Sequence, residues 1–171
     1  MALVLVGSAV VTESAQRRIF TNPKPEALVR RLFPQAASFS PLAGDPLHFK
    51  AFGEPNTAGQ ATLGYVFWTT DLVPREHGYH GPIHLLVGMD TAGILTGVIL
   101  DYDSEPYGYF SVQPPEFVAQ FKGKSIRDAF KLGADIDAVS RATITMTSAT
   151  RAIRDSARLM ARQFLSPDAV K

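Results

Sequence analysis

The chain has 171 residues, of which 46% are apolar and 19% are charged, and its formal net charge is +1. That length fits one domain with a hydrophobic core of its own. The near-neutral charge gives no reason to expect a nucleic-acid-binding protein, and the absence of cysteine excludes disulfides, thiolate metal sites and a cysteine nucleophile. The 13 glycines and 12 prolines predict many turns and loops of defined shape.

Residues 1–11 are small and apolar and carry no charge. They are too few to cross a bilayer, which takes about 20 residues. They are similar to the late part of a secretory signal, with the small residues Ser14 and Ala15 after them, but the basic start of such a signal is missing. Residues 1–20 are therefore expected to be a leader or an N-terminal extension that packs on the domain. No other segment reaches transmembrane length.

Hydrophobic periodicity and turn residues predict an α+β fold, a twisted antiparallel sheet with packed helices. In chain order, the expected elements are a helix at 24–33, a loop at 35–47, strands at 48–52, 61–70, 83–89 and 94–102, short helices at 114–121 and 125–132, and a long helix at 146–164. A turn at 90–93 joins the last two strands. These strands are almost wholly apolar, so both of their faces are expected to be covered.

The long helix carries two opposed stripes of side chains. Apolar residues recur every three or four positions and therefore share one face. Four arginines, Arg151, Arg154, Arg158 and Arg162, recur at the same spacing on the other side. We interpret them as a solvated face, with a docking surface for an acidic partner or for anionic lipid headgroups as the alternative.

Hydroxyl residues crowd the start of that helix, where Ser140, Thr143, Thr145, Thr147 and Ser148 lie within nine residues. The free backbone N–H groups and the positive dipole at a helix start favour an anion, and phosphate is a common ligand there. One serine or threonine would be enough for an N-cap. The density of hydroxyls therefore suggests a phosphate site, with ordinary capping as the alternative.

The stretch Asp137-x-x-Ser140-x-Ala142-Thr143, with Thr145 beyond it, resembles the D-x-x-S-G-A-T-x-T motif of FMN-binding domains. That family includes the flavoprotein subunits of the sodium-pumping NADH:quinone reductase and of Rnf complexes, and the exported N-terminal domain of NosR-type proteins. The resemblance implies that an FMN transferase esterifies Thr143 with the FMN phosphate. Arg141 stands where many members have glycine, and it could pair with the phosphate or with Asp137, or weaken recognition by the transferase.

Further stretches resemble the NosR-type branch of the family and follow in the same order. They are Gly64–Phe67 with Thr70–Pro74 (G-Y-V-F…T-x-D-V-V-P), Gly78–Ile83, Leu86–Asp90, Gly93–Val98 (G-x-I-x-G-V), and Glu105-Pro106-Tyr107-Gly108, which is an altered form of E-T-P-G. Together the matches span roughly residues 60–165. The resemblance therefore divides the chain into the leader or extension at 1–20, a helix and loop at 21–60, and an FMN-binding core at 61–171.

A flavin ring needs apolar walls and a few polar groups at its edge. The candidate walls are Tyr79, Trp68, Tyr107 and Leu95. Glu105 is expected either near the ring or holding a neighbouring loop. Three glycines, Gly78, Gly81 and Gly108, would let the backbone approach the ring closely. Ordinary packing is the alternative role for each of these side chains.

Three histidines, His77, His80 and His84, lie within eight residues. Their spacing would align them for a metal on a helix, but Gly78, Gly81 and Pro82 disfavour a helix there. No metal site is therefore expected. No glycine-rich phosphate loop or Ser-His-Asp pattern stands out either.

The function implied by the resemblance is that of an extracytoplasmic electron-transfer flavoprotein with FMN on Thr143. It would be an electron carrier or redox adaptor rather than a complete oxidoreductase, because the sequence shows no nicotinamide or iron–sulfur motif and no transmembrane bundle. Its expected partners are the FMN transferase and redox proteins, which a membrane could hold, and not nucleic acid. The expected location is the periplasm or another extracytoplasmic space, with membrane association through the N-terminus. Two alternatives stay open: a redox sensor that binds FMN non-covalently, and a flavin-free interaction domain.

Overall fold

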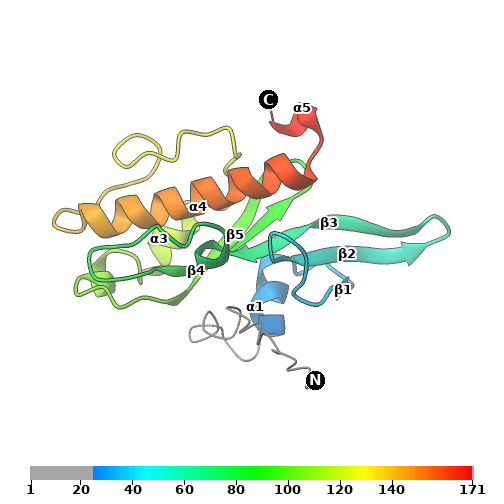
Figure 1. Cartoon of the computed structure of the whole chain (residues 1–171), viewed down its shortest axis with the longest axis horizontal. Helices are drawn as coiled ribbons and strands as arrows, with labels where there is room; N and C mark the ends of the chain where they lie inside the picture. Colours follow the sequence, from blue (N-terminus) through cyan, green and yellow to red (C-terminus); the bar gives the residue numbers. More distant parts are fainter. Residues whose placement is uncertain (1–24, 171) are drawn as a thin grey trace, which may run out of the picture.

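The computed structural model describes residues 25–170, which form one sheet with helices on both of its faces (Figure 1). The elements in chain order are α1 (Pro25–Leu32), β1 (Ser38–Phe39), β2 (Phe49–Asn56), β3 (Gly59–Trp68), α2 (Thr69–Leu72), β4 (His84–Asp90), β5 (Leu95–Tyr102), the 3₁₀ helix η2 (Gly108–Phe110), α3 (Pro115–Ala119), α4 (Thr143–Phe164) and α5 (Pro167–Val170). The α+β fold with an antiparallel sheet is confirmed. The leader or extension expected at 1–20 lies outside the described residues.

The sheet has the strand order β1-β2-β3-β4-β5, and each strand pairs antiparallel with the next along the chain. The hairpin between β4 and β5 closes on Asp90. Its Oδ1 accepts hydrogen bonds from the backbone N–H groups of Ala92 and Ile94, both at 2.9 Å, and Gly93 takes a φ of +80°. These are the local interactions that make an Asp-to-Gly stretch a turn, so the predicted hairpin is confirmed.

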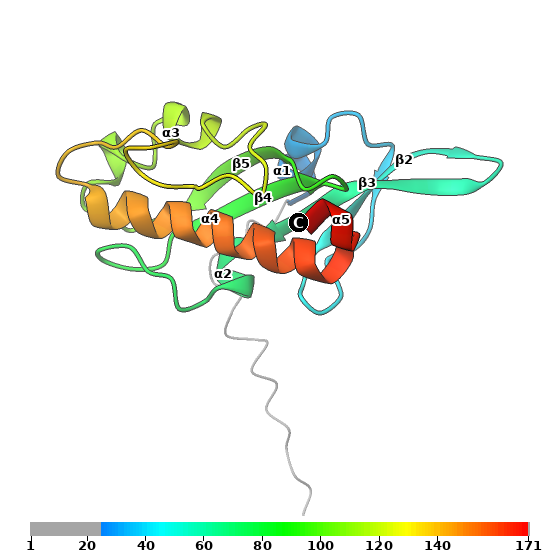
Figure 2. The same ribbon diagram turned by 90° about the horizontal axis from the view of Figure 1, so that it is seen from above.

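Two hydrophobic clusters lie on opposite faces of the sheet, because successive residues of a strand point to opposite sides. Along β3, Tyr65 and Phe67 pack in the cluster that α4 covers, whereas Val66 and Trp68 pack in the cluster that α1 covers. Figures 1 and 2 show α4 lying along one face and α1 against the other. The expectation that both faces are covered is therefore confirmed.

The short helix expected at 125–132 is not formed. The carboxylate of Asp135 binds two backbone N–H groups that a helix would use, because it accepts from Phe130 and Lys131 N–H at 3.0 and 2.6 Å, and Phe130 has a φ of +50°. Short polar side chains compete with helical hydrogen bonding in this way. The segment instead folds as a chain of turns.

Several boundaries differ from the expectation. β2 extends to Asn56 because it continues its pairing with β3 up to Asn56↔Gly59, and the expected loop at 35–47 contains the short β1. β3 ends at Trp68, and the next four residues form α2. α4 begins at Thr143 rather than Met146, with its first turn closed by the 3.0 Å bond from Met146 N–H to Ala142 O. Four of the five hydroxyl residues, all but Ser140, are thus part of the helix itself.

Within residues 25–170, none of the helices combines the length and the apolar character needed to cross a bilayer.

Candidate functional site

The 137–142 stretch leads into α4 and fixes where the helix starts. The Asp137 N–H donates to Gln120 Oε1 at 2.7 Å, and Ala142, at 3% exposure, is anchored in the core. Ser140 and Arg141 are exposed between these anchors, and Arg141 has a φ of +72°. Glycine adopts this left-handed conformation far more readily than other residues. The backbone here therefore suits the glycine that many members of the resembled family have at this position.

α4 starts without a side-chain cap, although hydroxyl residues surround its first turn. Its N-cap is Ala142, and no side chain accepts a hydrogen bond from the N–H groups there. Two of the hydroxyls are engaged elsewhere, because Thr145 donates to Glu105 and Ser148 to Glu76. Thr143 is exposed, and its hydroxyl makes no hydrogen bond to another residue in 25–170. The capping alternative is therefore wrong. An uncapped helix start with a free threonine hydroxyl fits a phosphate group.

Glu105 is the most connected side chain near this helix start. Its Oε1 accepts hydrogen bonds from the N–H groups of His80 at 2.8 Å and Gly81 at 3.2 Å, and its Oε2 accepts from Tyr79 N–H at 2.8 Å and from the Thr145 hydroxyl. Burial alone would raise the pKa of Glu105, but the bonds from Thr145 and from the three N–H groups lower it below its ordinary value. The carboxyl group is therefore ionised at neutral pH.

The three glycines expected near the flavin lie around Glu105 and its neighbour Asp103. A Cβ on Gly78 would lie 2.5 Å from Glu105 Oε1, and one on Gly108 would collide with Asp103 Oδ1. A Cβ on Gly81 would meet only Ser104 Oγ, at 3.0 Å. Because Gly78 and Gly108 have no Cβ, the carboxylates of Glu105 and Asp103 can lie close to the backbone at these two positions.

Tyr79 lies in the loop that Glu105 binds, and Tyr107 lies two residues after Glu105 in the chain. The Tyr79 backbone is bound by Glu105, while its side chain is 67% exposed; the side chain of Tyr107 is 49% exposed. Figures 1 and 2 place the loops that carry these residues at the end of the molecule where α4 begins. The side chains of both tyrosines are thus accessible to solvent.

Trp68 is not brought to this end of α4. It is 1% exposed in the cluster under α1, and its ring stacks on His84 with centroids 4.2 Å apart. The residue belongs to the sheet face opposite α4, because the alternation along β3 turns it away from Phe67. The structure thus places Trp68 in the core, which was the alternative to a flavin wall.

The histidines do not converge on a common point. His77 and His80 lie in the loop after α2, whereas His84 is the first residue of β4 and is 3% exposed. Burial lowers the pKa of His84 to about 4, and its Nδ1 lies 2.5 Å from Thr70 Oγ1. In the described part of the chain, no group of three His, Asp or Glu side chains is placed to hold a metal ion.

A cavity of about 420 Å³ lies between the first half of α4 and the 129–132 segment. Thr143, Thr147 and Thr150 line its helix side, at a spacing that puts them on one face. The Thr150 hydroxyl is buried and has no hydrogen-bond partner in the described residues. Sequence reasoning missed this cavity because it expected a helix at 125–132. The spacing of the three threonines was the available signal.

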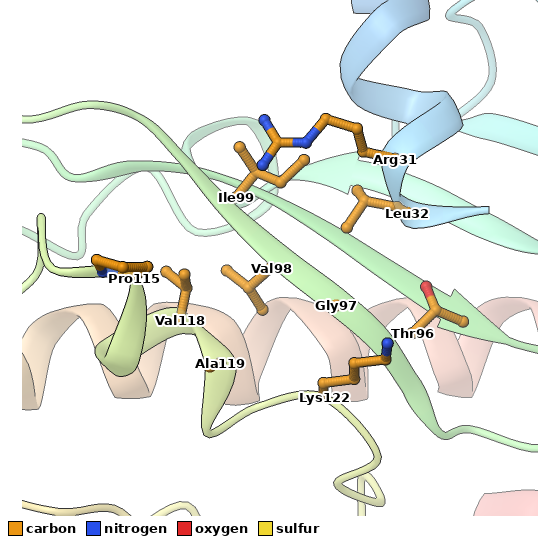
Figure 3. A pocket seen from close by; sticks show the side chains of 10 residues that line it. All are labelled: Arg31, Leu32, Thr96, Gly97, Val98, Ile99, Pro115, Val118, Ala119 and Lys122. Carbon is orange, nitrogen blue, oxygen red and sulfur yellow. The ribbon is translucent and has the colours of Figure 1, made fainter. Parts of the chain in front are cut away.

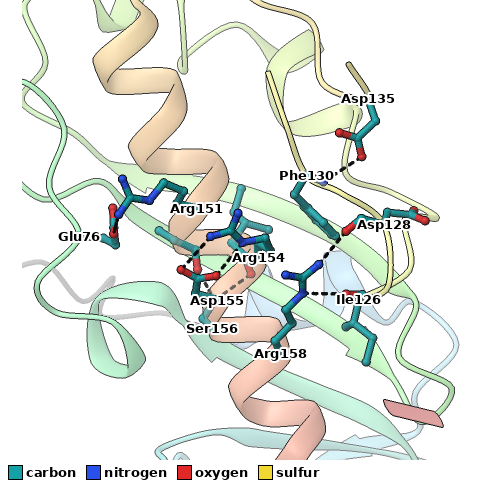
Figure 4. Close-up of polar contacts among 12 residues, drawn as sticks. Glu76, Ile126, Asp128, Phe130, Asp135, Arg151, Arg154, Asp155, Ser156 and Arg158 are labelled. Carbon is teal, nitrogen blue, oxygen red and sulfur yellow. Dashed lines mark hydrogen bonds and ion pairs between the residues drawn. The ribbon is translucent and has the colours of Figure 1, made fainter. Parts of the chain in front are cut away.

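The arginine stripe of α4 is largely engaged within the protein (Figure 4). Arg158 donates to the carbonyl oxygens of Ile126 and Asp128 at 2.9 and 2.8 Å. Arg151 pairs with Glu76 at 2.8 Å, and Arg154 pairs with Asp155 at 2.7 Å. Arg151 and Arg158 therefore tie the helix to the loops on either side of it, whereas Arg154 pairs within the helix, so these three arginines are not simply a solvated face.

A smaller cavity of about 190 Å³ lies at the outer edge of the sheet, between α1, β5 and α3 (Figure 3). Its floor is apolar, with Val98, Ile99 and Val118, and Arg31 and Lys122 stand at its rim. None of the residues carrying the family motifs at 105–108 or 137–145 lines it.

Comparison with known proteins agrees with this geometry. Residues 78–158 match the sequence model of the FMN-binding domain family. The chain is also 25% identical, over 176 aligned positions, to a subunit of the ion-translocating oxidoreductase complex of Methanosarcina acetivorans, and the alignment covers 95% of this chain and 89% of that protein. The matched segment contains Glu105, Thr143 and the 78–81 loop. Residues 78–158 thus match the FMN-binding domain family, and FMN is the cofactor that both comparisons support.

Proposed function

We propose that the protein is an extracytoplasmic electron-transfer flavoprotein whose FMN is joined to Thr143 as a phosphate ester. The observation that carries the proposal is the exposed Thr143 hydroxyl at the uncapped start of α4. In the ester, Thr143 Oγ replaces one phosphate oxygen of FMN, and the chain gains the mass of FMN less one water.

The residues around Thr143 have distinct tasks in this proposal. The N–H groups of the first turn of α4, Thr145 among them, donate to the phosphate, and Arg141 adds a positive charge beside it. Asp137 and Ser140 shape the loop that presents Thr143. Tyr79 and Tyr107 offer exposed ring faces for the flavin. The bound FMN supplies one- or two-electron transfer, and these contacts hold it and tune its potential.

The partners follow from the same proposal. An FMN transferase attaches the flavin, and redox proteins, among them membrane-bound ones, exchange electrons with it. The relative from Methanosarcina acetivorans is a subunit of an ion-translocating oxidoreductase complex, which supports a role within a membrane-associated redox chain on the extracytoplasmic side.

The test is the intact mass of the full chain after co-expression with an FMN transferase. We expect the added mass of FMN less water, and fluorescence of the band on a denaturing gel under ultraviolet light. Thr143→Val should lose both signals. Thr147→Val, on the same helix face and half-buried, is the matched control and should keep them. An adduct that survives in Thr143→Val would overturn the choice of residue.

Arg141 motivates a second candidate function, a redox sensor with FMN held non-covalently. Its side chain stands in the motif where glycine is common, close to the attachment threonine. A yellow protein without added mass would favour this candidate. A protein that stays colourless after incubation with FMN would favour a flavin-free interaction domain instead.

A further inference from the structure

We infer that Glu105 is a positioning residue that clamps the 78–81 loop to the first turn of α4 and keeps a fixed negative charge beside the flavin, without binding the flavin itself. The part of this inference that concerns the flavin rests on the proposed function. The part that concerns the clamp rests on the protein alone.

The carboxylate has no acceptor position left for a ligand. An ionised carboxylate offers about four lone-pair directions. Glu105 uses four: three consecutive backbone N–H groups, from Tyr79 to Gly81, and the hydroxyl of Thr145. The residue is also 6% exposed. A flavin N–H group would therefore have to displace a protein donor, so Glu105 acts on the flavin only through its surroundings.

The clamp joins three segments that are distant in sequence. The donors lie 24 to 26 residues before Glu105 in the loop and 40 residues after it in α4. Thr145 is two residues beyond Thr143, in the same first turn of the helix. The position of that turn, and with it the direction of the Thr143 hydroxyl, is thus coupled to the loop that carries Tyr79.

The charge of Glu105 is balanced by dipoles and not by a cation. In residues 25–170, no lysine, arginine or histidine forms an ion pair with it. N–H dipoles and the positive end of α4 stabilise the carboxylate but leave its net charge in place. A bound FMN would supply the redox chemistry, and the fixed charge of Glu105 would oppose the negative charge that reduction adds. Glu105 would therefore lower the flavin potential.

Three variants separate the clamp from the charge. Glu105→Gln keeps the size but removes the charge and turns one acceptor oxygen into a donor that faces N–H groups. Thr145→Val removes one bond and leaves the charge. Thr145→Ser keeps the hydroxyl and serves as the conservative control. The first readout is hydrogen exchange of the amides of residues 79–81 in the flavin-free chain, and the second is the midpoint potential of the flavin-loaded chain.

We expect Glu105→Gln to speed exchange at residues 79–81 by about tenfold or more, as the loss of a buried charge-assisted hydrogen bond implies, and to make the flavin potential more positive. Thr145→Val should speed exchange less and leave the potential near that of the wild type, and Thr145→Ser should match the wild type in both. Unchanged exchange in Glu105→Gln and in Thr145→Val would overturn the clamp. An unchanged potential in a loaded Glu105→Gln would overturn the charge effect.

A wild-type chain that takes up no flavin would count against the proposed function, while the exchange data from the flavin-free protein would still decide the clamp. If Glu105→Gln does not fold, Thr145→Val and Thr145→Ser carry the exchange test by themselves.

Discussion

Replacement of Arg141 by glycine should stabilise the protein. Arg141 has a φ of +72°, and a left-handed backbone costs a residue with a Cβ about 1–2 kcal/mol. Glycine removes this strain but adds freedom to the unfolded chain, which costs about 0.5–1 kcal/mol. The Arg141 side chain is exposed and makes no hydrogen bond or ion pair within residues 25–170, so little contact energy is lost. The expected net gain is about 0.5–1 kcal/mol.

Urea unfolding of the flavin-free protein, followed by far-ultraviolet circular dichroism, measures this gain. Ser140→Gly is the matched control, because Ser140 is the exposed neighbour and is not among the residues with positive φ. It should lose about 0.5–1 kcal/mol, the ordinary cost of glycine. A loss in Arg141→Gly equal to that in Ser140→Gly would refute the strain argument. We also expect a higher yield of FMN adduct from Arg141→Gly, since it restores the Ser-Gly-Ala-Thr sequence of the family.

Three further predictions concern the frame around the site. The pKa of His84 is about 4 in the folded protein and 6.5 in the unfolded chain. The free energy of unfolding should therefore fall by up to about 3 kcal/mol as the pH drops from 6.5 towards 4, and unfolding curves recorded across this range measure it. His84→Gln should lack this dependence of stability on pH. Gly78→Ala should cost about 1–3 kcal/mol because its methyl group meets a buried carboxylate, whereas Gly81→Ala should cost under about 1 kcal/mol; equal thermal shifts would contradict this. Arg158→Met should cost about 1–3 kcal/mol through two lost hydrogen bonds to carbonyl groups, and exposed Arg162→Met should stay within about 0.5 kcal/mol.

Local signals predicted much of the fold. The Asp90–Gly93 turn, the apolar stripe of α4 and the two apolar strands before it depend on interactions within a few residues, and all of them form as expected. The same reasoning failed at 125–132, where helical spacing is present but Asp135 accepts hydrogen bonds from the backbone N–H groups of Phe130 and Lys131. The spacing of residues indicates which side chains share a helix face, but it does not indicate which acceptor a backbone N–H group binds.

For the site, resemblance identified Glu105, Thr143 and Thr145 as residues of one region, and the fold brings Glu105 and Thr145 into direct contact. Their detailed roles were not readable. The Thr145 hydroxyl is one of the five whose density suggests a phosphate site, but it donates to Glu105, which lies 40 residues away in sequence. Only the packing of α4 against the 105–108 and 78–81 segments sets such a contact.

The sequence by itself determined the fold class, most strand and helix positions and the FMN-binding motif, because periodicity, turn chemistry and motif spacing are short-range properties of the chain. The tertiary structure decided which hydroxyls of α4 are engaged, which arginines are engaged and which face of β3 meets α4, so that Phe67 lies under the helix and Trp68 does not. The physical reason is that strand register and helix docking bring together groups whose distance along the chain carries no information about their distance in space.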